Sequence, residues 1–333
     1  MTAGRALYFA EPGSVDVRER PVPEPGPGEV RVRTELSAVS PGTELLVYRG
    51  EVPESMRADE TIDALEGTFS YPVQYGYAAV GRVTALGEGV DRGWLDRRVF
   101  AFHPHESHFL ADPEDLVTTD LPTDRALLIP NAEAAVSFAM DARPRVGARV
   151  AVFGQGPVGL LTTAVLAEFP LAELVAVDRL ESRRERARAF GADRAVSPEE
   201  VADAVGGDGA DVAIELSGSP AALDDAIDVT GYAGRVVVGS WYGTKAADLD
   251  LGGRYHRSHI RVRSSQVSRV DPDHAGRWDK ARRLAYVRSW LGAAEAELDA
   301  LLTHRVPIED AGDAYTLLAE RKEEALQVAF TYD

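Results

Sequence analysis

The sequence predicts a two-domain chain of the α/β class, in which a doubly wound parallel sheet is joined to a β-rich domain. Its 333 residues exceed one typical domain and suit two. Residues 149–178 contain, in order, a strand, a glycine turn, a helix, a second strand and an acid, the unit from which such sheets are built. Residues 5–120 instead carry short strand-like runs.

The first of these regions along the chain is the β-rich one. Residues 29–36 alternate apolar and polar side chains, as a half-buried strand does, and residues 21–28 form a proline-rich connector. The acidic residues 54–65 are expected to form an exposed, partly helical insertion. Strands are predicted at 5–9, 15–19, 29–36, 80–84 and 98–102, a spacing that favours a barrel or sandwich.

From about Asn131 the pattern changes to helices alternating with buried strands, which predicts a doubly wound sheet of about six strands. Helices are predicted at 132–143, 158–168, 181–190 and 221–229, and strands at 150–153, 174–177, 211–216, 235–240 and 260–264. Two more helices, 278–291 and 308–320, and a strand, 325–331, complete the chain.

The glycine turn has the order G-x-G-x-x-G. Gly154 permits the tight turn, Gly156 lets a pyrophosphate approach the backbone, and Gly159 lets the helix pack on the strand. The helix N-terminus then offers unpaired N–H groups to phosphate. The candidate cofactor-binding residues here are Gly154, Gln155, Gly156, Pro157, Val158 and Gly159. We therefore expect a dinucleotide site.

Asp178 at the end of the second strand is placed to accept hydrogen bonds from ribose hydroxyls and to repel a 2′-phosphate, which favours NAD. Arg179 and Arg183 follow it and leave NADP possible. Ligands bind beyond the carboxyl ends of parallel strands, so residues at the later strand ends are expected near the nicotinamide half. These are Ser217, Ser240, Trp241 and Gln266.

Composition excludes several classes of protein. The net charge of −18 argues against binding to nucleic acid or to an anionic membrane surface. The absence of cysteine rules out disulfides, thiolate zinc sites and a cysteine nucleophile. No signal-like or membrane-spanning apolar run is present, so a cytoplasmic protein is expected.

Several segments together resemble the medium-chain dehydrogenase/reductase superfamily over nearly the whole chain. They are residues 40–44 (S-P-G-T-E), 75–83 (Y-G-Y-A-A-V-G-R-V), the glycine turn, 211–219, 234–239 and 303–311. The resemblance implies a GroES-like catalytic domain, residues 1–130 and 267–333, and a Rossmann domain, residues 131–266, with the active cleft between them. It also implies a homo-oligomer, a dimer or tetramer joined through the nucleotide domains.

The chain departs from the zinc-dependent members of that superfamily. Pro41 stands where they have a catalytic cysteine, and Tyr77 stands where they have a histidine ligand. Their four-cysteine structural zinc lobe is missing. The chain therefore resembles a zinc-lacking branch, with a weaker similarity to bacteriochlorophyllide dehydrogenase-like members, and we expect no metal in the family's usual place.

Without zinc, hydrogen-bond donors must bind the reacting oxygen and move its proton. Tyr77 and Thr43 lie at family positions that serve these tasks, and Glu44 replaces the family's aspartate. His103 and His105, two apart on an extended chain, are expected to share a face and to serve as acid, base or ligand. The competing interpretations are packing for Tyr77, a local turn bond for Thr43 and a polar loop for the histidines.

These inferences predict a zinc-independent NAD(P)-dependent oxidoreductase that interconverts a secondary alcohol and a ketone. Its substrate would be a polar small molecule such as a sugar, a cyclitol or a specialised metabolite. The alternatives are a zinc-free enone or quinone reductase, a redox-neutral epimerase with bound NAD, and a non-catalytic dinucleotide-binding protein.

Overall fold

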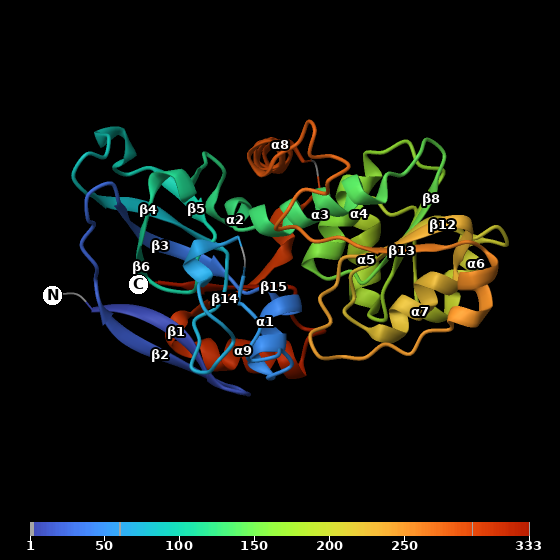
Figure 1. The fold of residues 1–333 in the computed structure, drawn as a ribbon, viewed down its shortest axis with the longest axis horizontal. Helices are drawn as coiled ribbons and strands as arrows, with labels where there is room; N and C mark the ends of the chain where they lie inside the picture. Colours follow the sequence, from blue (N-terminus) through green and yellow to red (C-terminus); the bar gives the residue numbers. More distant parts are fainter. Residues whose placement is uncertain (1–2, 60, 295, 333) are drawn as a thin grey trace. The chain divides into compact units, whose positions relative to one another are not determined.

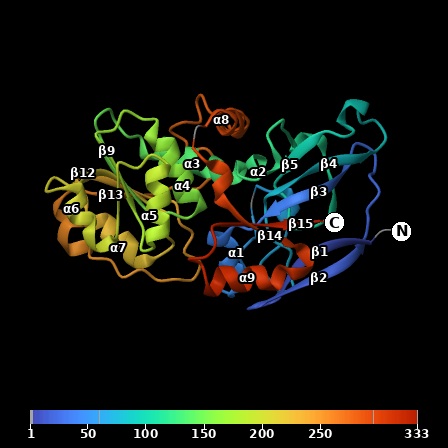
Figure 2. The same cartoon turned by 180° about the vertical axis from the view of Figure 1, so that it is seen from behind.

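The computed structural model describes residues 3–59, 61–294 and 296–332, and it divides into two compact units. The first contains residues 1–130 and 298–333, and the second contains residues 131–297. Each is shown in Figure 1 and, from behind, in Figure 2. No helix among the described residues is long and apolar enough to cross a membrane.

The first unit is built on antiparallel strands. β1 (Ala3–Glu11) and β2 (Ser14–Pro21) form a hairpin. A larger sheet has the strand order β14-β15-β3-β4-β5-β7, with β6 also pairing with β3. Its strands are β3 (Val30–Ala38), β4 (Ala79–Leu86), β5 (Arg98–Ala101), β6 (His108–Ala111), β7 (Val117–Thr118), β14 (Leu302–Pro307) and β15 (Gln327–Thr331).

The alternation in β3 that predicted a half-buried strand is confirmed by its pairing and burial. Val30 and Val32 are fully buried beside Val83, Val99 and Phe109, and these side chains form a core of the sheet. Because successive side chains on a strand point to opposite faces, Arg31 and Arg33, which alternate with the valines, stay partly or fully exposed.

A helix that the sequence analysis did not predict follows β3. Residues 41–48 form α1 (Pro41–Tyr48), with Ser40 as its N-cap and Pro41 in its first turn. Proline suits this position because its missing N–H would be unpaired there. Residues 54–65 contain one short 3₁₀ turn, Asp63–Leu65, and α2 (Thr123–Ala126) and α9 (Ala311–Glu320) complete the helices of this unit.

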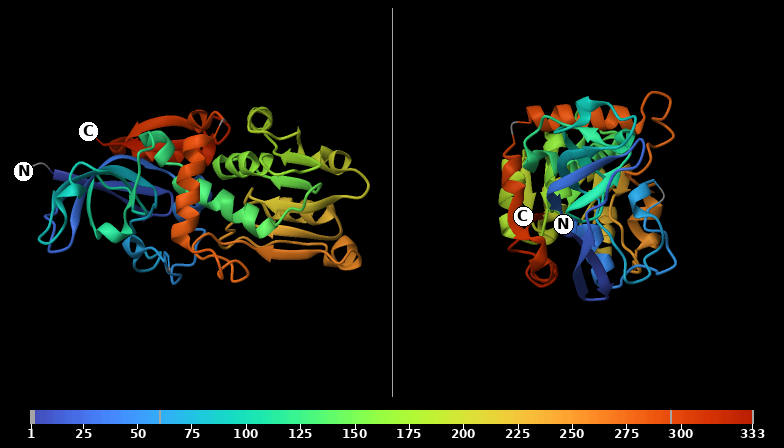
Figure 3. Two further views of the ribbon diagram at one scale, coloured as in Figure 1. Left: turned by 90° about the horizontal axis from the view of Figure 1, so that it is seen from above. Right: turned by 90° about the vertical axis from the view of Figure 1, so that its left-hand side faces the viewer.

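The second unit is a parallel six-stranded sheet in the order β10-β9-β8-β11-β12-β13, as predicted. Its strands, seen side by side in the left view of Figure 3, are β8 (Arg149–Phe153), β9 (Glu173–Val177), β10 (Arg194–Val196), β11 (Ala210–Glu215), β12 (Thr230–Val238) and β13 (Arg261–Ser264). β10 was missed, because three residues are too few to show a period.

Helices flank this sheet. α4 (Pro157–Ala167) and α5 (Glu181–Ala189) contact each other and β9, while α6 (Val201–Val205) and α7 (Pro220–Asp228) share a second apolar core (Figures 1 and 2). α3 (Ile129–Ala142) precedes β8, and α8 (Lys280–Ala293) follows the sheet.

The second boundary of the units differs from the predicted domains. Residues 267–297, which we assigned to the first domain, belong to the second unit. The reason is a buried cation on α8: Arg283 is 1% exposed and donates to Glu133 and to Ser137 on α3. A buried guanidinium requires such partners, so α8 packs where α3 provides them.

Candidate active site

The glycine turn has the geometry of a phosphate cradle. Gly154 has a φ of +88°, and a Cβ there would lie 2.6 Å from the backbone of Ser217. A Cβ at Gly159 would lie 1.8 Å from the carbonyl oxygen of Gly154. At Gly156, the N-cap of α4, a Cβ would meet no atom within 4 Å. The turn is therefore closely packed at Gly154 and Gly159 and open at Gly156, where a pyrophosphate would bind.

Asp178 organises this turn as well as ending β9. Its Oδ2 accepts the backbone N–H of Gln155 at 2.7 Å, and its Oδ1 accepts that of Leu180 at 2.9 Å. Each carboxylate oxygen can accept a second bond, so hydrogen bonding to ribose is compatible with these contacts.

The arginines after Asp178 differ in what they contact. The Arg184 guanidinium donates to the carbonyl oxygens of Asp178 and Arg179 and pairs with Glu181. Arg183 lies 3.9 Å from an Asp178 carboxylate oxygen, and Arg179 is exposed. Arg184 is thus engaged within the protein, whereas Arg179 remains accessible.

Two predicted cofactor residues prove to have structural side chains. The Gln155 side chain is fully buried; it donates to the carbonyl oxygen of Val152 and accepts from Thr163. Only its backbone faces Asp178. Gln266 is exposed and makes two hydrogen bonds with Ser268, which close a local turn. Pro157 is buried in the first turn of α4, and Val158 beside it is half-buried.

The ends of β11 and β12 are tied together by a buried carboxylate. Glu215 is fully buried and accepts from the Ser217 hydroxyl and from the Tyr242 hydroxyl, each at 2.5 Å. Ser240 accepts the N–H of Gly218 at 2.9 Å. These bonds bring Ser217 and Ser240 together beyond the strand ends, and Trp241 between Ser240 and Tyr242 is half-buried. Glu215 was not among the predicted site residues.

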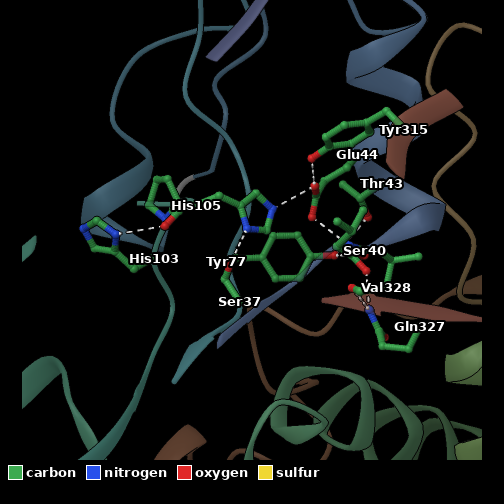
Figure 4. Close-up of polar contacts among 12 residues, drawn as sticks. Ser37, Ser40, Thr43, Glu44, Tyr77, His103, His105, Tyr315, Gln327 and Val328 are labelled. Atoms are coloured by element: carbon green, nitrogen blue, oxygen red, sulfur yellow. Dashed lines mark hydrogen bonds and ion pairs between the residues drawn. The ribbon is translucent and has the colours of Figure 1, made fainter. Parts of the chain in front are cut away.

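In the first unit, Tyr77 belongs to a cluster of three hydroxyls (Figure 4). Its phenol lies 2.5 Å from Ser40 Oγ and 3.1 Å from Thr43 Oγ1. Burial raises the pKa of Tyr77, and the nearby Glu44 carboxylate adds to that rise. The phenol therefore stays protonated at neutral pH and acts as a hydrogen-bond donor.

Glu44 lies directly behind this cluster and is fully buried. Its Oε2 accepts from the Tyr315 hydroxyl at 2.6 Å and lies 3.0 Å from His105 Nε2. Its Oε1 accepts the backbone N–H of Ser40 at 2.7 Å. The carboxylate thus holds the first turn of α1, which carries Ser40 and Thr43, so Glu44 positions the hydroxyls.

The hydrogen-bond network continues inward from Glu44. Ser37 Oγ lies 2.7 Å from His105 Nδ1, and the Tyr332 hydroxyl lies 2.6 Å from Ser37 Oγ. Gly76 allows this arrangement, since it has a φ of +120° and a Cβ there would lie 2.7 Å from the His105 ring. Tyr315, Ser37 and Tyr332 were not predicted, because no local pattern connects them with residue 44.

The expectation that His103 and His105 share a face is wrong. His105 is fully buried against Glu44, whereas His103 stacks on Phe109 with ring centroids 3.9 Å apart. Figure 4 shows His103 on the side of His105 away from Tyr77. The cause is that residues 102–105 do not form a regular strand, so the two-residue alternation does not apply.

Within the described parts of the chain, no group of three or more histidine or carboxylate side chains has the geometry to hold a metal ion. The buried Glu133 carboxylate accepts from Arg283 at 2.8 Å.

Comparisons with known proteins agree with this architecture. The family model described as zinc-binding dehydrogenase matches residues 157–286. An alcohol dehydrogenase from Cupriavidus necator is 25% identical, covering 98% of both chains. The (R,R)-butanediol dehydrogenase of Bacillus subtilis is 26% identical, covering 77% of this chain and 81% of its own.

The fold also matches solved structures. One is an alcohol dehydrogenase (rspB) from Escherichia coli CFT073, described as complexed with NADH. It covers 100% of both chains, with a TM-score of 0.79 and 20% identity. With the parallel sheet and the glycine turn, these findings show that the chain is similar in sequence and fold to alcohol and butanediol dehydrogenases, and that residues 157–286 match the zinc-binding dehydrogenase family model.

Proposed function

We propose that this oxidoreductase interconverts a secondary alcohol and a ketone of a polar small molecule with NAD, and that it does so without zinc. The observation that carries the proposal is the Tyr77 phenol, held by Ser40 and Thr43 as a protonated donor. The relatives named as alcohol and butanediol dehydrogenases support the reaction class.

The second unit fits a dinucleotide. The open face at Gly156 and the unpaired N–H groups of α4 suit a pyrophosphate, and the carboxylate of Asp178 suits ribose hydroxyls. Repulsion between Asp178 and a 2′-phosphate, together with the internal bonding of Arg184, supports NAD over NADP. When bound, the dinucleotide would supply or accept the hydride.

The residues of the first unit would manage the substrate oxygen. Tyr77 would donate a hydrogen bond to the ketone oxygen, and on reduction its proton would pass to that oxygen while a solvent proton restores the phenol. The phenol has one hydrogen, which points to Ser40 and Thr43 in the structure, so these two hydroxyls would donate to the Tyr77 oxygen and hold it in place once that hydrogen turns to the ketone. Glu44 and His105, predicted as catalytic, are fully buried, and we propose a positioning role for both.

The donor set argues against zinc in the usual place. A tyrosine and a proline stand at the two family ligand positions, and the chain has no thiolate. The carboxylates of Glu44 and Glu133 already accept hydrogen bonds from Tyr315 and Arg283. The test is to measure activity after extensive treatment with a metal chelator. Full retention of activity supports the proposal, and a loss of activity that only added zinc restores refutes it.

The reaction class is tested by assaying a panel of ketones and enones with NADH and NADPH. We expect ketone turnover that falls at least about a hundredfold in Tyr77→Phe, with cofactor binding unchanged. Turnover of enones alone would instead identify an enone or quinone reductase. Stereochemical inversion without net NADH consumption would identify an epimerase, and tight cofactor binding without hydride exchange would identify a non-catalytic protein.

We also propose that the chain forms a homo-oligomer. β13 lies at the edge of the parallel sheet, and Arg261, Val262 and Ser264 on it are exposed. An unpaired edge strand is suited to pairing with a second copy. Light scattering after size exclusion tests this, and a monomer at micromolar concentration contradicts it. A cytoplasmic location remains a prediction.

A further inference from the structure

Residues 103–108 (H-P-H-E-S-H) contribute side chains to a second site besides the Glu44 network. Its residues His103, Glu106 and His108 line a cavity of about 250 Å³ in the first unit. The hairpin β1–β2 contributes Arg5 and Arg20 to the same cavity. None of these side chains belongs to the Tyr77 cluster or to the glycine turn, so the proposed oxidoreductase chemistry leaves the cavity unassigned.

The charged groups of this cavity are close to one another without being fully bonded. Glu106 lies 3.6 Å from Arg20 Nη1 and 3.5 Å from His103 Nε2, both beyond the usual length of a hydrogen bond. Arg20 also donates to Gln74 at 3.1 Å and keeps its other N–H groups available. A polar group of a ligand in the cavity can therefore form hydrogen bonds with Arg20 and Glu106 at the same time.

The balance of charge in the cavity is positive. Arg5 pairs with Glu309, but Arg20 is half-exposed with Glu106 as its only carboxylate in the cavity lining that the structure describes. Burial raises the pKa of Glu106 to about 7, so the carboxyl is mostly neutral in mildly acidic solution. Burial likewise lowers the pKa of His103 to about 4, which keeps the imidazole neutral.

We propose that this cavity binds a small oxyanion, a carboxylate or a tetrahedral group of the sulfate and phosphate type, with Arg20 as its cationic partner. The protonated Glu106 hydroxyl donates a second bond to the anion, and the stacking of His103 on Phe109 holds the imidazole plane against the cavity wall. In a chain of net charge −18, a cavity lined by Arg5 and Arg20 is a distinct place for an anion to bind.

The pH dependence of binding follows from the groups around Glu106. Arg5 and Arg20 line the same cavity, and burial lowers the pKa of His108 from its ordinary value, which favours the neutral imidazole. Tyr332, which Glu106 also influences, has a raised pKa and stays neutral. Because burial raises the pKa of Glu106 to about 7, its protonated fraction falls about tenfold between pH 6 and pH 8.

The test is calorimetric titration of the full-length protein with sulfate and with acetate, at constant ionic strength maintained by chloride. Both probes keep their charge between pH 6 and pH 8. We expect saturable binding about tenfold tighter at pH 6 than at pH 8, at least about tenfold weaker binding in Arg20→Ala, and no pH dependence in Glu106→Gln.

Arg18→Ala is the matched control, because Arg18 lies on the same strand, pairs with Asp16 and does not line the cavity. Binding of sulfate alone identifies a tetrahedral ligand, and binding of acetate alone identifies a carboxylate. Absence of saturable binding by either probe overturns the proposal, as does equal weakening by Arg18→Ala and Arg20→Ala. A pH dependence that persists in Glu106→Gln overturns the role of Glu106.

Discussion

Tyr315→Phe removes one hydroxyl from a fully buried site and leaves the ring in place. That hydroxyl donates to Glu44 Oε2 at 2.6 Å, and the Tyr315 ring contacts Phe9, Tyr48 and Phe330. A hydrogen bond to a charged group contributes about 1.5 to 3 kcal/mol. The carboxylate keeps Ser40 N–H and His105 as donors, so we expect the loss to stay within that range.

The consequence should be local, because Glu44 is on α1. Exchange of the α1 backbone amides, measured by mass spectrometry on the peptide covering residues 41–48, should quicken by about 10-fold to 100-fold. Turnover should fall as well, because Ser40 and Thr43 begin this helix.

Tyr232→Phe is the control, because Tyr232 is 74% exposed and the removal of its hydroxyl breaks hydrogen bonds with solvent only. We expect α1 exchange to be unchanged in that variant. If both variants leave α1 exchange the same as the wild type, Glu44 does not hold the helix and its positioning role must be abandoned.

Three further predictions concern other buried or charged groups. Arg283→Met should destabilise the second unit by about 3 to 5 kcal/mol in urea unfolding, because it leaves the buried Glu133 carboxylate without its cationic partner. Adding Glu133→Gln should recover part of that loss. Because the pKa of Glu106 is higher in the folded protein than in the unfolded chain, protonated Glu106 contributes to folding stability at a pH below the unfolded-state pKa. That contribution is lost as the pH rises through about 7, the pKa in the folded protein. Glu106→Gln should therefore gain on the wild type between pH 5 and pH 8, and parallel stability curves would contradict this. Asp178→Asn should raise the NADP to NAD ratio of kcat/KM at least about tenfold, and an unchanged ratio would remove Asp178 from cofactor selection.

The second unit was largely predictable because its signals are periodic and local. Apolar runs bounded by helices predicted five of its six strands, and β8, α4 and β9 begin and end within a residue or so of the expected positions. Where the signal was short or ambiguous, prediction failed. α1 was not predicted, although Ser40 before Pro41 is a helix-start pattern.

The domain boundary predicted at residue 267 differs from the boundary between the compact units at residue 297 for another reason. α8 was predicted as a helix and is one, but which unit it joins depends on Arg283 meeting Glu133, 150 residues earlier. Helical periodicity reports which face is apolar and contains no information about the partner of a buried charge.

The sequence by itself determined the cradle of residues 149–178, because every requirement of that motif lies within thirty consecutive residues and acts through backbone geometry. It also carried the resemblance to the medium-chain dehydrogenase/reductase superfamily and the absence of cysteine thiolates, which are matters of residue type. Only the tertiary structure decided the environment of Tyr77. Glu44 meets Tyr315 across 271 positions, and Ser37 meets Tyr332 across 295. It also separated His103 from His105, since irregular backbone and competing buried partners, rather than spacing, set the direction of each ring.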